Sequence, residues 1–171
     1  SIDAVRVTAR HVPDGPHLTP TFVASLPDAM RHRQDGFAAT GSIHAAAAFH
    51  PQGDLLAVRE DVGRHNAVDK LVGRLASTSW PIEPTVMLVS GRISFEMVQK
   101  AAVAGIPVIC GVSGASSLAV ELGDELGMTV IGFLRGDTFN VYCGEERFSQ
   151  PFWRGSRDDV PVSHAKTDKE A

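Results

Sequence analysis

Three short segments of the chain contain glycine together with serine or arginine, in a pattern that suits anion binding. They are residues 60–66 (EDVGRHN), 90–94 (SGRIS) and 113–117 (SGASS). Each lies between an apolar run and a run with helical spacing, so each is expected to lead from a strand into a helix. A helix start offers unpaired backbone N–H groups and the positive end of the helix dipole, and Arg64 and Arg92 add forked guanidinium donors. The pattern indicates a ligand that carries phosphate, without indicating a reaction.

A plainer interpretation exists for several of these residues. Ser94 and Ser116 stand where helices are expected to begin, and serine at that position usually only caps the helix. Glu60 and Asp61 are equally consistent with solvated turn acids that pair with basic neighbours. The ligand interpretation gains support because the three segments are expected at one edge of a sheet, beyond the carboxyl ends of the strands, where ligands collect.

Histidine and cysteine provide the other candidates for chemistry. His65 starts a helix beside two acids, where it is a candidate for moving a proton in support of catalysis. His44 lies among small residues, which is typical of a hydrogen-bonded structural histidine. Cys110 falls in a buried strand-like run and is expected to be inert, whereas Cys143 near a strand end is expected to be more exposed. These residues have no zinc-site spacing, so no metal site is predicted.

Composition limits the class of protein. The chain has 171 residues, of which 43% are hydrophobic and 21% charged, which indicates one soluble domain with a single core. The net charge of −4 argues against a surface committed to nucleic acid, and no apolar run approaches the roughly 18 residues of a membrane span. Two cysteines without a paired motif are typical of a reducing cytoplasm. The chain begins with Ser1, so we expect it to start inside a longer protein.

Strand-like and helix-like segments alternate along the chain from residue 42. Runs at 42–49 and 54–60 flank a polar turn and predict a hairpin. Further strands are predicted at 84–90, 106–114, 128–136 and 138–144, and helices at 64–77, 94–105 and 116–127. This order predicts an α/β fold, with a mixed, mostly parallel sheet, helices on both faces and antiparallel pairing at the margins.

The domain organisation follows from the same pattern. Residues 1–35 are expected to form an arm followed by one or two short helices, with an interruption at Pro27. Residues 36–149 form the predicted α/β domain. The polar residues 150–171 are predicted to be a flexible tail.

Five strings of the sequence resemble the FdhD/NarQ family: TGSIHAAAAF, EDVGRHNAVDKLVG, SGRISFEMVQKA, AGIPVICGVSGASSLAVELG and GFLRGDTFNVYCG. They span about residues 36–145, which is most of the expected domain. The second and third strings are long and ordered, so chance similarity is not expected. The resemblance implies a fold related to cytidine deaminase, in agreement with the order of elements.

The resemblance also implies a function. Members of the family accept sulfur from a cysteine desulfurase as a cysteine persulfide and pass it to the molybdenum of a bis(molybdopterin guanine dinucleotide) cofactor for formate dehydrogenase. The chain is then expected to belong to a cytoplasmic, homodimeric sulfurtransferase, with GDP as a mimic of the bound substrate. The segment that matches the family's cofactor-binding residues is Phe133, Leu134, Arg135, Gly136, Asp137 and Thr138. Further candidates for this site are Arg64, Arg92, Ser94 and Ser116.

Departures from the related motifs sharpen this expectation. Deaminases carry His-x-Glu and paired zinc cysteines at two helix starts, where this chain has His65-Asn66-Ala67 and Arg92-Ile93-Ser94-Phe95. Neither deamination nor bound zinc is therefore expected. The family's Cys-x-x-Cys loop is expected upstream of Ser1, so the persulfide cysteine is expected outside this chain. The alternative to a sulfurtransferase is a non-catalytic chaperone that binds the molybdenum cofactor.

Overall fold

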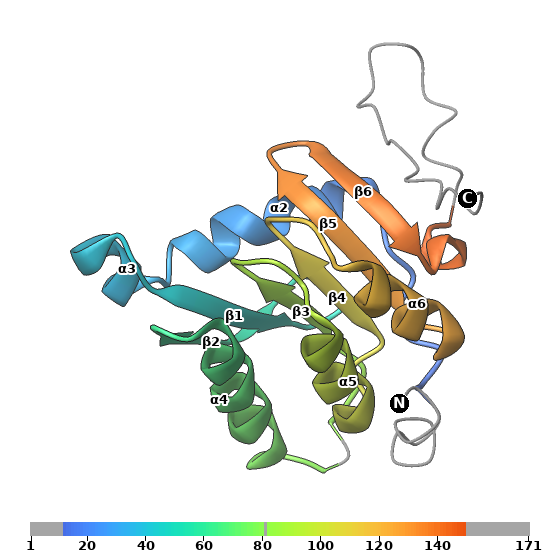
Figure 1. Cartoon of the computed structure of the whole chain (residues 1–171), viewed down its shortest axis with the longest axis horizontal. Coiled ribbons are helices and arrows are strands. Elements are labelled where there is room, and N and C mark those ends of the chain that lie inside the picture. Colours follow the sequence, from blue (N-terminus) through green and yellow to red (C-terminus); the bar gives the residue numbers. More distant parts are fainter. Residues whose placement is uncertain (1–11, 81, 150–171) are drawn as a thin grey trace.

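The computed structural model describes residues 12–80 and 82–149 and shows a six-stranded sheet with helices packed against it (Figure 1). The strands are β1 (His44–Phe49), β2 (Leu55–Asp61), β3 (Val86–Val89), β4 (Val108–Gly111), β5 (Thr129–Arg135) and β6 (Thr138–Cys143). The helices are α2 (Pro20–Arg31), α3 (Asp35–Thr40), α4 (Arg64–Ala76), α5 (Phe95–Ala104) and α6 (Ser117–Glu125), and a short 3-10 helix, η1, covers Glu145–Arg147.

The strand order is β2-β1-β3-β4-β5-β6. The mixed sheet is confirmed, but its pairings are mostly antiparallel, which corrects the expectation of a mostly parallel sheet. Only β3–β4 and β4–β5 pair in parallel, whereas β1 is antiparallel to both β2 and β3, and β6 is antiparallel to β5. The reason is that the predicted hairpin inserts β1 between β2 and β3. Because β1 reverses direction against both neighbours, β2 still runs the same way as β3, β4 and β5.

Helices cover both faces of the sheet, as predicted (Figure 1). On one face, apolar residues of α4, α5 and α6 pack against alternate strand residues such as Ala46, Met87 and Ile109. On the other face, α2 packs against the residues in between, such as Ala47 and Leu88. Successive side chains of a strand point to opposite faces, so the continuous apolar runs of β1, β3 and β4 bury both sides.

Local sequence signals explain most helix boundaries. Thr19 caps α2 by accepting a hydrogen bond from the Phe22 N–H, with proline in the first turn. Helix α5 stops at Gly105, which has the left-handed φ of 80° that favours glycine. The expected interruption at Pro27 is wrong, since α2 continues through this residue to Arg31. The packing of α2 on the sheet offsets the hydrogen bond that proline cannot donate.

The segment before α2 is attached to the end of the domain. The guanidinium group of Arg147 donates to the Asp14 carbonyl over 2.9 Å and to the Thr129 hydroxyl over 3.1 Å. Residues 1–11, part of the predicted arm, and the predicted flexible tail 150–171 lie outside the described residues. The division of the chain at residues 35 and 149 therefore stays a prediction.

Candidate functional site

The loops singled out from the sequence meet at one edge of the sheet, which we call the carboxyl edge. It is the edge at which β2, β3, β4 and β5 end. Residues 60–66 include the last two residues of β2 and the loop after it, residues 90–94 and 113–117 follow β3 and β4, and residues 133–138 lie at the end of β5. The N-terminal end of β1 lies at the same edge, because His44 pairs with Asp61. The expectation that three glycine-rich loops share one edge is confirmed.

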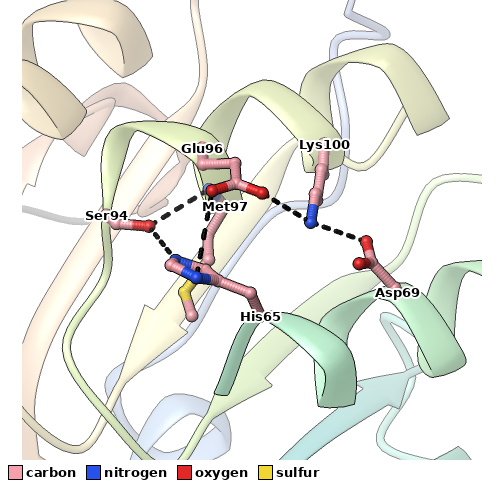
Figure 2. Close-up of polar contacts among 6 residues, drawn as sticks. All are labelled: His65, Asp69, Ser94, Glu96, Met97 and Lys100. Atoms are coloured by element: carbon pink, nitrogen blue, oxygen red, sulfur yellow. Dashed lines mark hydrogen bonds and ion pairs between the residues drawn. The ribbon is translucent and has the colours of Figure 1, made fainter. Parts of the chain in front are cut away.

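A side-chain hydrogen bond joins the first two loops. His65, in the first turn of α4, places its Nε2 atom 2.9 Å from the hydroxyl oxygen of Ser94 (Figure 2). Ser94 is also the N-cap of α5 and accepts a hydrogen bond from the Met97 N–H. The capping role expected for Ser94 is therefore present together with a contact to the histidine.

Backbone hydrogen bonds join the second loop to the third. The Ile93 N–H donates to the Gly114 carbonyl, and the Ser116 N–H donates to the Ile93 carbonyl, both over 3.0 Å. Ser116 caps α6 by accepting from the Ala119 N–H. Since these bonds fix the starts of α5 and α6 relative to each other, a ligand at this edge would meet a preformed surface.

Phe133 lies on the β5 side of the site and has a strained backbone conformation. Its φ of 52° is left-handed, which is rare for a bulky residue, and its side chain is 45% exposed. The Phe133 N–H donates to the Ser113 carbonyl, and the ring lies against Gly114. The register of the pairing with β6 shifts between Gly132 and Arg135, the stretch that contains Phe133. The result is an exposed aromatic ring beside the third helix start.

The remaining residues of the 133–138 segment have different environments. Leu134 is fully buried, so its side chain belongs to the core. Arg135 is exposed, and its Nε atom donates weakly to the Val112 carbonyl over 3.5 Å. Gly136 and Asp137 form the tight turn into β6, where Gly136 has a φ of 54°. Thr138 donates its hydroxyl to the Arg135 carbonyl.

Two of the acids at the carboxyl edge, Glu60 and Asp61, are engaged by other partners. The Glu60 carboxylate accepts hydrogen bonds from the Gly36 and Phe37 N–H groups. Asp61 pairs with Lys70, as the plainer interpretation expected. The hydrogen bond from Lys70, supported by those from Gly63 and Asn66, lowers the pKa of the Asp61 carboxyl to about 2.

The arginines at this edge are less constrained. The Nε atom of Arg64 is buried and has no hydrogen-bond partner among the described residues. Its Cδ atom lies near Gly91, as does the imidazole of His44. Arg92, on the same loop as Gly91, is exposed. A buried guanidinium nitrogen without an acceptor fits the expectation of an anionic ligand, since an unmet donor costs free energy.

The two cysteines are poor candidates for sulfur chemistry. Cys110 is fully buried in β4, as expected, and burial raises the pKa of its thiol far above the usual range. Cys143 is only 9% exposed, which corrects the expectation of greater exposure. Its thiol donates to the Met128 carbonyl, and burial raises its pKa to about 12. The thiolate is the reactive form, so neither cysteine is activated.

Sequence reasoning missed a chain of charged residues behind His65. Glu96 lies 3.8 Å from the Nδ1 atom of His65, and Lys100 bridges Glu96 and Asp69 (Figure 2). The four-residue spacing of Glu96 and Lys100 on a predicted helix was an available signal. The link to His65 was not available, because it joins two helices. Within residues 12–80 and 82–149, no set of three or more His, Cys, Asp or Glu side chains could hold a metal ion, and no helix is long and apolar enough to span a membrane.

Comparison with known proteins assigns this architecture to a family. The model of the FdhD/NarQ family matches residues 1–149. A protein of Streptomyces avermitilis named sulfur carrier protein FdhD is 58% identical to this chain, and the match covers 87% of this chain and 54% of the relative. A protein of the same name from Saccharolobus solfataricus is 51% identical, and the match covers 73% of this chain and 49% of the relative. The chain thus spans about half the length of these relatives. A crystal structure described as a formate dehydrogenase accessory protein, from Desulfotalea psychrophila, superposes with a TM-score of 0.71 at 30% identity, covering 78% of this chain and 59% of the other.

Proposed function

The chain belongs to the FdhD/NarQ family, and on this premise we propose that it is the substrate-binding part of a sulfur carrier that serves formate dehydrogenase. In this proposal the whole protein receives sulfur from a cysteine desulfurase as a persulfide. It then transfers the sulfur to the molybdenum of bis(molybdopterin guanine dinucleotide), which is its substrate, before the cofactor enters formate dehydrogenase. The protein acts in the cytoplasm as a homodimer.

The observation that carries the proposal is the unpartnered guanidinium nitrogen of Arg64 beside linked helix starts. Guanine dinucleotide ends carry phosphates, which bind to forked arginines and to backbone N–H groups at helix starts. Arg64, Arg92 and Arg135 stand at three strand ends of the carboxyl edge, while Glu60 and Asp61 are engaged elsewhere. These charges support binding of a phosphate ligand at this edge.

Phe133 supports the nucleotide part of the assignment. A base can stack on an exposed aromatic ring, and such stacking contributes about 1–3 kcal/mol per base. The left-handed backbone conformation of Phe133 costs free energy. Strain of this kind concentrates at ligand sites. Phe133 and Arg135 therefore supply the base and phosphate contacts in the proposal, whereas Leu134 holds the strand in the core.

The sulfur-carrying cysteine lies outside these residues in the proposal. Cys110 and Cys143 are buried with raised thiol pKa values, so neither is suited to attack a persulfide. The contribution of this chain is to bind the nucleotide ends and to provide positive charge and N–H donors near the sulfur. These groups would stabilise the thiolate that leaves when sulfur is transferred.

A cofactor-binding chaperone without catalysis is the second candidate. Binding alone needs the carboxyl edge and no activated thiol, and both cysteines of this chain are buried. A sulfur-transfer assay on the full-length protein distinguishes the two. With the loop cysteine changed to alanine, loss of active formate dehydrogenase supports the sulfur carrier, and retention supports the chaperone.

Nucleotide binding can be tested on the chain itself by calorimetry with GDP and ADP. We expect tighter binding of GDP, and a loss of about tenfold or more in the Arg64→Ala variant, since one charge-assisted hydrogen bond contributes about 1.5–3 kcal/mol. Arg74→Ala is the matched control, because Arg74 lies in the last turn of the same helix. Absence of heat with either nucleotide, on folded protein, would rule out the assignment of the carboxyl edge as a guanine nucleotide site.

A further inference from the structure

The hydrogen bond between His65 and Ser94 can run in either direction, and the tautomer of the His65 ring decides which. The Ser94 hydroxyl oxygen accepts from the Met97 N–H, and its single hydrogen can donate to the ring when Nε2 is unprotonated. The ring atom of His65 that contacts the Ser94 hydroxyl is Nε2, at 2.9 Å. If the hydroxyl donates, Nε2 must carry a lone pair, so the proton of a neutral ring must be on Nδ1.

Glu96 stabilises that arrangement from the opposite side of the ring. Its Oε2 atom lies 3.8 Å from the Nδ1 atom of His65, so a proton on Nδ1 faces a negative charge. The hydrogen bond and charge of Lys100 lower the pKa of the Glu96 carboxyl, which keeps it ionised. A negative group beside one ring nitrogen favours the tautomer protonated at that nitrogen.

The carboxylate is held in place by two further residues. Lys100 contacts Glu96 over 2.8 Å and Asp69 of α4 over 2.7 Å. Burial opposes the charge of Lys100, but hydrogen bonds with both carboxylates raise its pKa above the usual value. Lys100 is only 25% exposed, so the ion pairs join α4 to α5 directly behind the histidine (Figure 2).

We propose that Glu96 is a positioning residue that holds His65 in the Nδ1–H tautomer, so that Nε2 accepts a proton at the carboxyl edge through the Ser94 hydroxyl. The inference rests on the proposed function, and the group that gives up the proton is the S–H of the persulfide brought to this edge. The S–H bond breaks with its electron pair left on sulfur, the proton passes to the Ser94 oxygen, and the hydroxyl proton of Ser94 passes to Nε2. This step leaves the persulfide as an anion and His65 as an imidazolium, which Glu96 stabilises.

The tautomer can be measured without any ligand. In ¹⁵N-labelled chain, two-bond proton–nitrogen correlations of the neutral His65 ring should show Nδ1 protonated and Nε2 unprotonated. Glu96→Ala and Ser94→Ala should each shift the population towards the Nε2–H form, and Lys100→Met should do so to a smaller extent. Glu121→Ala, which removes an exposed carboxylate from α6, should leave the spectrum unchanged. An Nε2–H ring in the parent chain, or no effect of Glu96→Ala, overturns the proposal.

A second measurement tests the use of the proton acceptor. In the full-length sulfur carrier, His65→Gln should slow sulfur transfer by about 100-fold or more, the usual contribution of a positioned acid–base group. Glu96→Ala should slow it less and shift its pH profile, whereas a purely structural role for Glu96 would lower the melting temperature without shifting the profile. Normal transfer by His65→Gln contradicts the proton-acceptor role alone. Failure of the parent chain to bind GDP contradicts the proposed function and leaves the tautomer result unaffected.

Discussion

The ring of Phe133 covers Gly114 so closely that a Cβ atom on this glycine would lie 2.9 Å from the ring Cζ atom. The contact joins the end of β5 to the loop that precedes α6. It places an exposed aromatic surface next to a helix start. In the proposed function, a base stacks on this ring and the arginines of the same edge bind its phosphates.

Replacing Phe133 by glycine should separate binding from stability. Glycine adopts the φ of 52° found at this position without strain, so the melting temperature should change little. GDP affinity should fall by a factor that corresponds to about 1–3 kcal/mol of lost stacking. Calorimetry and thermal unfolding measure the two effects. Trp80→Ala is the control, because Trp80 is an exposed aromatic residue that precedes β3, whereas Phe133 lies near the end of β5. An equal loss in both variants would contradict the stacking role.

Arg135 should matter for binding rather than for folding. Its side chain is exposed and donates only a long hydrogen bond, of 3.5 Å, to the Val112 carbonyl. Arg135→Ala should weaken GDP binding by about tenfold or more, and Arg135→Lys should recover little, because lysine lacks the bidentate fork. The melting temperature should barely move. If both variants bind GDP like the parent, Arg135 is only a surface charge.

Neither cysteine of the chain should become a persulfide. Burial raises the pKa of the Cys143 thiol to about 12 and that of Cys110 still further, so the reactive thiolate is scarce at neutral pH. After incubation with a cysteine desulfurase and cysteine, intact mass spectrometry should show no added sulfur. Unfolded chain treated with an alkylating agent serves as the control, since both thiols should then react. A persulfide on Cys143 in folded protein would overturn the assignment of the reactive cysteine to a segment outside this chain.

Acid should destabilise the protein partly through Asp61. The pKa of this carboxyl is about 2 in the folded protein, against 3.8 ordinarily, so the folded state binds fewer protons than the unfolded state between these values. The stabilisation is complete above about pH 4 and is lost as the pH falls towards 2. Melting temperatures between pH 7 and 2 should therefore fall less steeply for Asp61→Asn than for the parent. Asp124→Asn, at an exposed site on α6, should follow the parent curve, and parallel curves for all three proteins would contradict the role of Asp61.

Most individual elements of this fold could be predicted because their signals are local. The apolar runs at β3 and β4, the helical spacing of α4 and the stop at Gly105 depend on residues within a few positions of each other. The three loops that combine glycine with serine or arginine were identified for the same reason. Membership of the family was also determined by the sequence, since long ordered strings such as EDVGRHNAVDK do not arise by chance.

The directions and contacts between elements were decided by the tertiary structure. A hairpin can join the sheet by either strand, and its insertion by β1 made the sheet mostly antiparallel. Helix α2 tolerates Pro27 because its packing on the sheet outweighs a lost hydrogen bond. Cys143 is buried although it is the last residue of β6. His65 meets Ser94 and Glu96 only when α4 and α5 lie side by side. Such long-range contacts depend on how the elements pack, and local residue patterns do not encode this packing. The sequence alone therefore determined which groups are available for chemistry, and the fold decided which of these groups meet.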